Sequence, residues 1–195
     1  MVDQFIYISS AAIFGNPEKC PLDEKHPRNP LSPYGVSKLA GENYAFAFQE
    51  SYGLKVTSIR PFNIYSPRQD PNSPYSGVIS RFIERAKEKK PLTVHGDGNQ
   101  TRDFIYATDV VKMVQLCAGN PDAYGQAFNC GTGKATSVLE LAKEIIKVSG
   151  ENADIEFTES RKGDILHSSA DISKAKKILG YKPTIELKKG LEDFF

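Results

Sequence analysis

Phe5-Ile6-Tyr7-Ile8-Ser9-Ser10-Ala11-Ala12 is the stretch of sequence that decides the fold. Its first four residues are a short apolar run, which predicts a buried β-strand over 5–8. Two serines follow immediately, so we expect their hydroxyls at the carboxyl end of that strand. Open α/β sheets bind their ligands at this edge. The stretch therefore predicts an α/β protein with a polar site where the strand ends.

A tyrosine and a lysine four residues apart follow in Ser32-Pro33-Tyr34-Gly35-Val36-Ser37-Lys38. Apolar residues at helical spacing predict a helix over 35–50, with Gly53 as its stop. Residues four apart share one helix face, so Tyr34 and Lys38 point at the same space. A neighbouring cation favours the phenolate form of a tyrosine and lowers its pKa. Such a tyrosine can exchange a proton with a sugar or alcohol hydroxyl, which a serine across the pocket would hold.

The rest of the chain alternates between predicted strands and helices. Ser137 and Glu140 form a capping box at the start of a helix that Gly150 ends. The expected strands are 55–60, 92–95, 127–130 and 155–158, and the expected helices are 77–89, 107–118, 137–149, 173–179 and 187–195.

Composition excludes several classes of function. The 195 residues include 25 Lys and Arg and 24 Asp and Glu, a net charge of +1 that gives no electrostatic argument for nucleic acid or an acidic membrane. No apolar run approaches the roughly 20 residues of a membrane span, and no signal peptide precedes Phe5. We therefore expect a cytoplasmic protein with buried free thiols at Cys20, Cys117 and Cys130. No Cys/His cluster has metal-ligand spacing, so no metal is expected.

Five stretches resemble the extended short-chain dehydrogenase/reductases, specifically the NAD-dependent nucleotide-sugar epimerase/dehydratase family, with UDP-glucose 4-epimerases the nearest members. They follow the family order over nearly the whole chain. The stretches are Ser-Ser-Ala-Ala-Ile-Phe-Gly (9–15), Ser-Pro-Tyr-Gly-Val-Ser-Lys (32–38), Arg-Pro-Phe-Asn-Ile-Tyr-Ser-Pro-Arg (60–68), Gly-Asp-Gly-Asn-Gln-Thr-Arg-Asp-Phe-Ile-Tyr (96–106) and Arg-Lys-Gly-Asp (161–164).

The resemblance implies a Rossmann-like parallel sheet and a smaller α+β domain that binds the substrate. Residues 1–75 and 104–130 would be the remainder of the NAD-binding domain and carry the Ser/Tyr/Lys site. Residues 76–103 and 131–195 would bind the nucleotide sugar. The implied partners are a UDP-sugar and a second copy of the chain, since members of the family are commonly dimers.

The glycine-rich turn through which the family binds NAD is missing from this sequence. Gly96/Gly98 and Gly131/Gly133 each lack a third glycine at the family's spacing. We therefore expect an incomplete Rossmann-like sheet without its first strands, from the C-terminal part of an epimerase. Such a chain would not retain NAD, would be inactive alone, and would associate with itself through the exposed sheet edge.

The resemblance also assigns roles to single residues. Ser10 would bind the 4-hydroxyl of the sugar, Tyr34 would be the catalytic base, and Lys38 would hold the nicotinamide ribose. Ser9 and Phe62 would join these three on the cofactor side. Besides Ser10 and Tyr34, the implied substrate-binding residues are Asn63, Arg102 and Arg161 at the diphosphate, Asp164 at the uridine ribose, Thr93 and His95 at the base, and Val78.

The residues after Ser10 bear on the reaction. Dehydratases of the family carry an Asp-Glu pair there, whereas this chain has Ala11 and Ala12, which cannot move protons. The resemblance thus implies epimerisation at C4 of UDP-glucose or UDP-galactose through a 4-keto intermediate, as in galactose metabolism. The alternatives are an epimerase for UDP-uronate or UDP-N-acetylhexosamine, or a non-catalytic fragment that binds nucleotide sugar.

Overall fold

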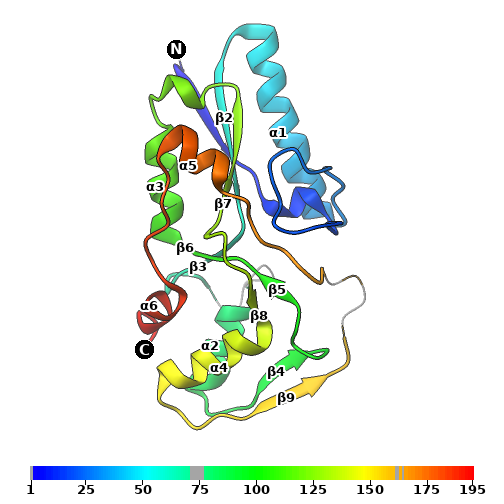
Figure 1. Ribbon diagram of the computed structural model, residues 1–195, viewed down its shortest axis with the longest axis vertical. Helices are drawn as coiled ribbons and strands as arrows, with labels where there is room; N and C mark the ends of the chain where they lie inside the picture. Colours follow the sequence, from blue (N-terminus) through cyan, green and yellow to red (C-terminus); the bar gives the residue numbers. More distant parts are fainter. Residues whose placement is uncertain (1, 71–76, 161–162, 164) are drawn as a thin grey trace.

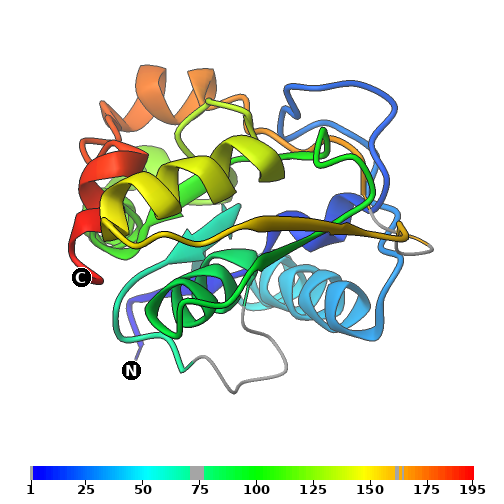
Figure 2. The same ribbon diagram turned by 90° about the horizontal axis from the view of Figure 1, so that it is seen from below.

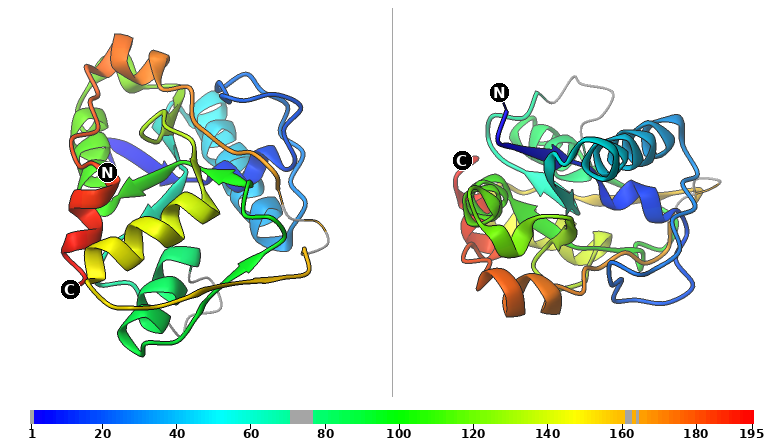
Figure 3. Two further views of the ribbon diagram at one scale, coloured as in Figure 1. Left: turned by 60° about the horizontal axis from the view of Figure 1, so that its bottom comes forward. Right: turned by 90° about the horizontal axis from the view of Figure 1, so that it is seen from above.

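A parallel three-stranded sheet forms the upper half of the molecule (Figure 1). The computed structural model describes residues 2–70, 77–160, 163 and 165–195. Helix α1 covers one face of the sheet, whereas α3 and α5 lie against the other (Figure 3). This arrangement confirms the expected α/β class. The elements are β1 (Gln4–Ile8), β2 (Lys55–Pro61) and β7 (Gln126–Cys130), in the order β1-β2-β7, with α1 (Pro33–Tyr52), α3 (Ala107–Cys117) and α5 (Ser173–Leu179).

The lower half is built around the parallel pair of β4 and β9, beside which α2 and α4 lie (Figure 2). Two short strand pairs, β3 with β6 and β5 with β8, lie between this unit and the sheet. The bounds are β3 (Asn63–Tyr65), α2 (Val78–Lys87), β4 (Leu92–His95), β5 (Thr101–Arg102), β6 (Phe104–Tyr106), β8 (Thr136–Ser137), α4 (Val138–Ser149), β9 (Ile155–Thr158) and α6 (Leu187–Glu192), with short 3₁₀ turns at Ala11–Phe14 and Pro121–Ala123.

All the predicted strands and helices are present, with small differences at their ends. Helix α1 starts earlier than expected because the Ser32 side chain caps it by accepting a hydrogen bond from Gly35 N, and Pro33 occupies its first turn. Gly53 ends it with φ of 71°. Helix α6 ends at Glu192 instead of 195. The capping box of Ser137 and Glu140 is confirmed.

Two glycines let α1 lie unusually close to the end of β1. A Cβ atom at Gly35 would come within 2.7 Å of the Ala12 carbonyl oxygen, and one at Gly41 would overlap the Tyr7 hydroxyl. Any side chain at these positions would push the helix away from the sheet. The close approach sets Tyr34 and Lys38, on the same helix, beside the serines that follow β1.

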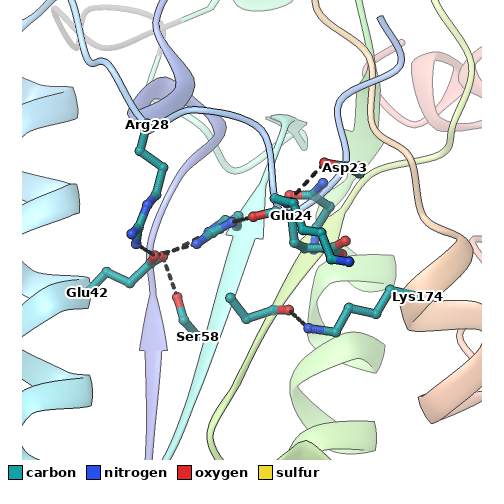
Figure 4. A network of polar contacts seen from close by, with 10 residues as sticks. Asp23, Glu24, Arg28, Glu42, Ser58 and Lys174 are labelled. Atoms are coloured by element: carbon teal, nitrogen blue, oxygen red, sulfur yellow. Dashed lines mark hydrogen bonds and ion pairs between the residues drawn. The ribbon is translucent and has the colours of Figure 1, made fainter.

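A buried ion pair fastens the same face of α1 to β2 (Figure 4). The Glu42 carboxylate is fully buried and accepts two hydrogen bonds from Arg60, at 2.6 Å and 3.0 Å. Ser58 Oγ donates to it at 2.8 Å and Arg28 at 3.3 Å. Arg60 also donates to the Glu24 carbonyl oxygen at 2.9 Å. Since 34, 38 and 42 share one helix face, this contact fixes the orientation of that face.

Two hydrophobic clusters fill the interior. One lies between the sheet and its helices and includes Ile13, Ile59, Phe128 and Tyr181. The other joins α2, β4 and α4 and also takes in Tyr65 and Tyr106. The exact division of the chain into two domains stays a prediction.

The cysteines are free, but one of them is not buried as predicted. Cys117 and Cys130 lie in the core, where burial raises the pKa of both thiols. Cys20 is exposed because it lies in the loop that follows Gly15, where its thiol faces the His167 carbonyl oxygen at 3.4 Å. None of the helices that the structure describes is long and apolar enough to cross a membrane.

Candidate active site

A cavity of about 490 Å³ opens at the carboxyl ends of β1 and β2. A larger one of about 720 Å³ lies toward α2 and β4. Four residues, Asn63, Gly77, Val78 and Arg102, line both, so the cavities adjoin. Every described residue of the predicted site lines at least one of them. Ser9, Ser10, Tyr34, Lys38 and Phe62 line the first, Thr93 and His95 the second, and Asn63, Val78 and Arg102 both; Arg161 and Asp164 lie outside the described residues.

Ser10 stands where β1 turns into a 3₁₀ helix. Ser9 N continues the ladder by donating to the Ile59 carbonyl oxygen at 2.8 Å, and the Ser9 side chain is buried. Ser10 Oγ accepts a hydrogen bond from Ala12 N at 3.1 Å, which caps the short helix. A hydroxyl that accepts one bond still has its own hydrogen to donate. Ser10 can therefore donate to an oxygen atom in the first cavity.

Lys38 links helix α1 to the end of β1. Its ammonium donates to the Ile8 carbonyl oxygen at 2.9 Å. It lies 5.8 Å from the ring centre of Tyr34 and 5.6 Å from that of Tyr7. Burial raises the pKa of Tyr7, and Glu42 and Tyr34 act in the same direction, so Tyr7 stays protonated. Tyr34, by contrast, keeps 43% of its surface exposed. Of these two tyrosines, Tyr34 is therefore the one that lines the cavity and that a ligand there can reach.

The boundary between the two cavities is suited to an anion. The N-terminus of α2 carries no side-chain cap, because Gly77 is its N-cap residue. The first backbone N–H groups of a helix have no partner within it, and the helix dipole favours negative charge there. Arg102 and Asn63 line the same boundary. A guanidinium, an amide and a helix N-terminus together can hold phosphate oxygens.

Two residues of strand β4, Thr93 and His95, line the second cavity. Leu92 N donates to the carbonyl oxygen of Asp154, just before β9, at 2.7 Å. Gly96 N donates to the carbonyl oxygen of Thr158, the last residue of β9, at 2.9 Å. Alternate residues of a strand face opposite sides, so Thr93 and His95 direct their backbone groups away from β9. The Gln100 side chain donates to the His95 carbonyl oxygen at 2.7 Å, and the His95 ring contacts Thr158 Oγ1 at 2.9 Å. No hydrogen bond to the Thr93 backbone is found within the described residues, so these groups can pair with a planar polar ring.

Sequence reasoning missed several residues that shape the site. Glu42 lies four residues beyond Lys38 on the same face of α1, and that spacing could have indicated it. Gln69, Ile165 and Ser168 line the first cavity from loops. They lie in irregular segments, whose sequence carries no periodic signal.

Proteins of one family resemble this chain along nearly its whole length. The family model described as GDP-mannose 4,6 dehydratase matches residues 2–194. A putative UDP-glucose 4-epimerase of Methanocaldococcus jannaschii is 42% identical over 192 residues, which are 98% of this chain and 61% of that protein. The chain spans about three fifths of the length of the curated relatives it matches.

Two solved structures share the whole described architecture. The UDP-glucose 4-epimerase of Thermotoga maritima with UDP-glucose superposes with a TM-score of 0.93 at 37% identity, over 99% of this chain and 62% of that one. The UDP-glucuronic acid 4-epimerase of Bacillus cereus, in complex with UDP-glucuronic acid and NAD, gives 0.90 at 35% identity, over 99% and 60%. Because the family model matches nearly the whole of this chain, the chain belongs to the GDP-mannose 4,6-dehydratase family, the nucleotide-sugar epimerases and dehydratases of the extended short-chain dehydrogenase/reductase type.

Proposed function

We propose that this chain supplies the catalytic and substrate-binding residues of an NAD-dependent UDP-hexose 4-epimerase that acts on UDP-glucose and UDP-galactose. The observation that carries the proposal is that Ser10, Tyr34 and Lys38 line one cavity. Where this cavity meets the second one, Arg102 and the N-terminus of α2 offer positive charge and hydrogen-bond donors for an anion. The hexose would lie in the first cavity, the diphosphate at the boundary, and the uridine in the second cavity.

Each residue at the reacting end has a distinct task. Ser10 donates a hydrogen bond to the 4-oxygen of the hexose, and Tyr34 takes the proton of that hydroxyl and later returns it. The Lys38 ammonium would donate hydrogen bonds to the nicotinamide ribose of the cofactor. NAD, when bound, supplies the hydride acceptor at C4 and the donor for its return. The first cavity would have to let the 4-keto sugar rotate, so that either face of C4 could be presented to the same side of the cavity.

The residues that line the first cavity suit the nicotinamide end of NAD. Within the described part of the chain, the Lys38 ammonium donates one hydrogen bond, to the Ile8 carbonyl oxygen, which leaves donors for ribose hydroxyls. Ser9, Ser10, Tyr34 and Phe62 line the cavity around it. These five residues would hold the nicotinamide end of the cofactor.

Ala11 and Ala12 favour epimerisation over dehydration. Both line the first cavity next to Ser10. A dehydratase must deliver and remove protons at C5 and C6, and methyl groups cannot do so. Epimerisation needs only Ser10, Tyr34 and the cofactor.

A second candidate function is 4-epimerisation of another UDP-sugar, such as a UDP-uronate or a UDP-N-acetylhexosamine. The Bacillus cereus structure holds UDP-glucuronic acid, and it superposes on this chain almost as well as the UDP-glucose enzyme does. A third candidate is a fragment that binds nucleotide sugar without turning it over.

A substrate panel separates these candidates. We expect the 195-residue chain with added NAD to give no turnover, since no glycine-rich turn is present for the pyrophosphate. Joined to the dinucleotide-binding segment of a relative, it should interconvert UDP-glucose and UDP-galactose faster than UDP-glucuronate or UDP-N-acetylglucosamine. A preference for either of the last two would replace the first candidate, and binding of UDP without turnover of any sugar would favour the third.

We expect Arg102→Ala to weaken UDP binding by about 10- to 100-fold, because a charge-assisted contact to phosphate is lost. Calorimetry with UDP and the 195-residue chain measures the change. Arg68→Ala is the matched control, because Arg68 is exposed and lines neither cavity. Equal affinities for the wild type and Arg102→Ala would remove Arg102 from the diphosphate site.

We also expect the chain to self-associate through β1. In the part of the chain that the structure describes, β1 is an edge strand, and Phe5 is 43% exposed on it. Unpaired edges with apolar side chains pair with other chains. Phe5→Lys should therefore raise the monomer fraction in light scattering, whereas Val111→Lys, at an exposed apolar position on α3, should not. Association lost only in Phe48→Lys would place the interface on α1 instead.

A further inference from the structure

Asp103 is a fully buried carboxylate beside the anion site, and the proposed function gives it no task. Four donors surround it. Its Oδ1 accepts from Thr132 N at 2.8 Å and from Thr132 Oγ1 at 2.6 Å, and its Oδ2 accepts from Gly133 N at 2.9 Å and Ala170 N at 3.2 Å. Burial raises the pKa of Asp103, and these four bonds act in the opposite direction.

The turn after β7 is shaped around this carboxylate. A Cβ atom at Gly131 would lie 2.6 Å from Asp103 Oδ2 and 2.7 Å from the Ala170 side chain. Only glycine lets the turn close on the carboxylate and on Ala170 together. The backbone N–H groups of this turn are therefore occupied by Asp103 and are not available to a phosphate.

The backbone of Asp103 holds a residue of the anion site. Its carbonyl oxygen accepts from Asn63 N at 2.9 Å and from the Asn63 side-chain amide at 3.3 Å. Arg102 precedes it in the chain and lines both cavities. Both predicted diphosphate residues that the structure describes are thus attached directly to Asp103.

The same region is tied to the segment that contains Ser168. Thr101 N donates to the Leu166 carbonyl oxygen at 2.8 Å, and Ser168 N donates to the Thr101 carbonyl oxygen at 3.1 Å. Ala170 N then reaches the Asp103 side chain. Asp103 is where the strand of Arg102, the turn at 131–133 and the segment at 165–170 meet.

We propose that Asp103 is a positioning residue for the nucleotide diphosphate, holding Asn63 and Arg102 in the geometry that binds it. The inference rests on the proposed function, because that function is what places a diphosphate at the boundary of the cavities. Asp103 touches neither cavity, and it acts through the two residues attached to it.

Asp103→Asn tests the inference, since it keeps the shape of the side chain but puts an amide among four donors. Calorimetry with UDP and the 195-residue chain should show binding weakened by about 10- to 100-fold. Asp97→Asn is the matched control, because Asp97 is an exposed carboxylate of the same stretch whose side chain bonds only to Asn99 among the described contacts. Its affinity should equal that of the wild type.

A second pair of variants covers the case in which Asp103→Asn does not fold. Thr132→Val removes one donor to the carboxylate, so UDP affinity should fall by about 3- to 10-fold. Thr132→Ser keeps the hydroxyl and should restore it. A purely structural role predicts lower thermal stability with an unchanged Kd for the folded protein, and that result would overturn the inference.

UDP binding by the wild-type chain distinguishes an error in the role of Asp103 from an error in the proposed function. If the wild-type chain binds UDP and Asp103→Asn or Thr132→Val binds it equally well, only the role of Asp103 is wrong. If the folded wild-type chain does not bind UDP, the proposed function and the role of Asp103 are both wrong.

Discussion

Replacing Tyr34 with phenylalanine should lower the rate of UDP-hexose epimerisation by roughly 10²- to 10⁴-fold, the usual contribution of a general acid–base group. The ring would still pack beside Lys38, and only the atom that moves the proton would be lost. UDP affinity should stay nearly unchanged, because Tyr34 lines the first cavity and not the second. The rate is measured on the chain joined to a dinucleotide-binding segment, and UDP affinity by calorimetry.

Tyr44→Phe is the matched control on the same helix. Tyr44 is 71% exposed and lines neither cavity, so its loss of a hydroxyl should leave the rate unchanged. A Tyr34→Phe variant with a near-normal kcat would show that another group moves the proton. Lys38 would then need a new explanation as well, since its ammonium is held beside that phenol.

The second large effect is expected on stability. Glu42→Gln should destabilise the fold by about 3–5 kcal/mol, because it leaves the buried Arg60 guanidinium without a counter-charge. Urea unfolding measures the loss, with Glu50→Gln at an exposed position of α1 as the control. Replacing Glu42 and Arg60 together with methionine should recover much of the stability. If Glu42→Gln unfolds at the same urea concentration as the wild type, the ion pair does not hold α1 in place.

The same pair makes a prediction for pH. Burial alone would raise the pKa of Glu42, but the bonds from Arg60 and Ser58 outweigh it and hold the pKa below its usual range. A carboxyl whose pKa is lower in the folded state stabilises the protein fully above its unfolded pKa. The contribution of Glu42 is therefore complete at neutral pH and declines as the pH falls through the folded pKa. The difference in stability between wild type and Glu42→Gln should shrink in acid.

Local patterns in the sequence were enough to predict the reacting end of the site. The apolar run before Ser9 and Ser10 placed the serines at a strand end, and the four-residue spacing of Tyr34 and Lys38 placed them on one helix face. Each signal spans only a few neighbouring residues, so it can be read without knowledge of the fold. The role predicted for Arg102 came from resemblance to a family, because the spacing of a lone arginine does not indicate a ligand.

The supporting contacts could not be predicted, because they join segments that are far apart in the chain. Asp103 bonds to Thr132 and Ala170, and Glu42 bonds to Arg60 on another element. Such pairs leave no periodic trace, since each partner is one polar residue in a different local context. Cys20 was wrongly placed for a similar reason. Its exposure depends on the path of a loop that periodicity does not describe.

The adjoining cavities have a consequence for how such a protein can change its substrate. Among the residues that the structure describes, only Asn63, Gly77, Val78 and Arg102 line both cavities, so most of the lining of the first cavity is independent of the lining of the second. In the proposed function, mutations in the lining of the first cavity can therefore change which hexose is accepted while the affinity for the nucleotide stays the same. Related proteins with this arrangement can therefore change their sugar specificity by single mutations, without an intermediate that no longer binds the nucleotide.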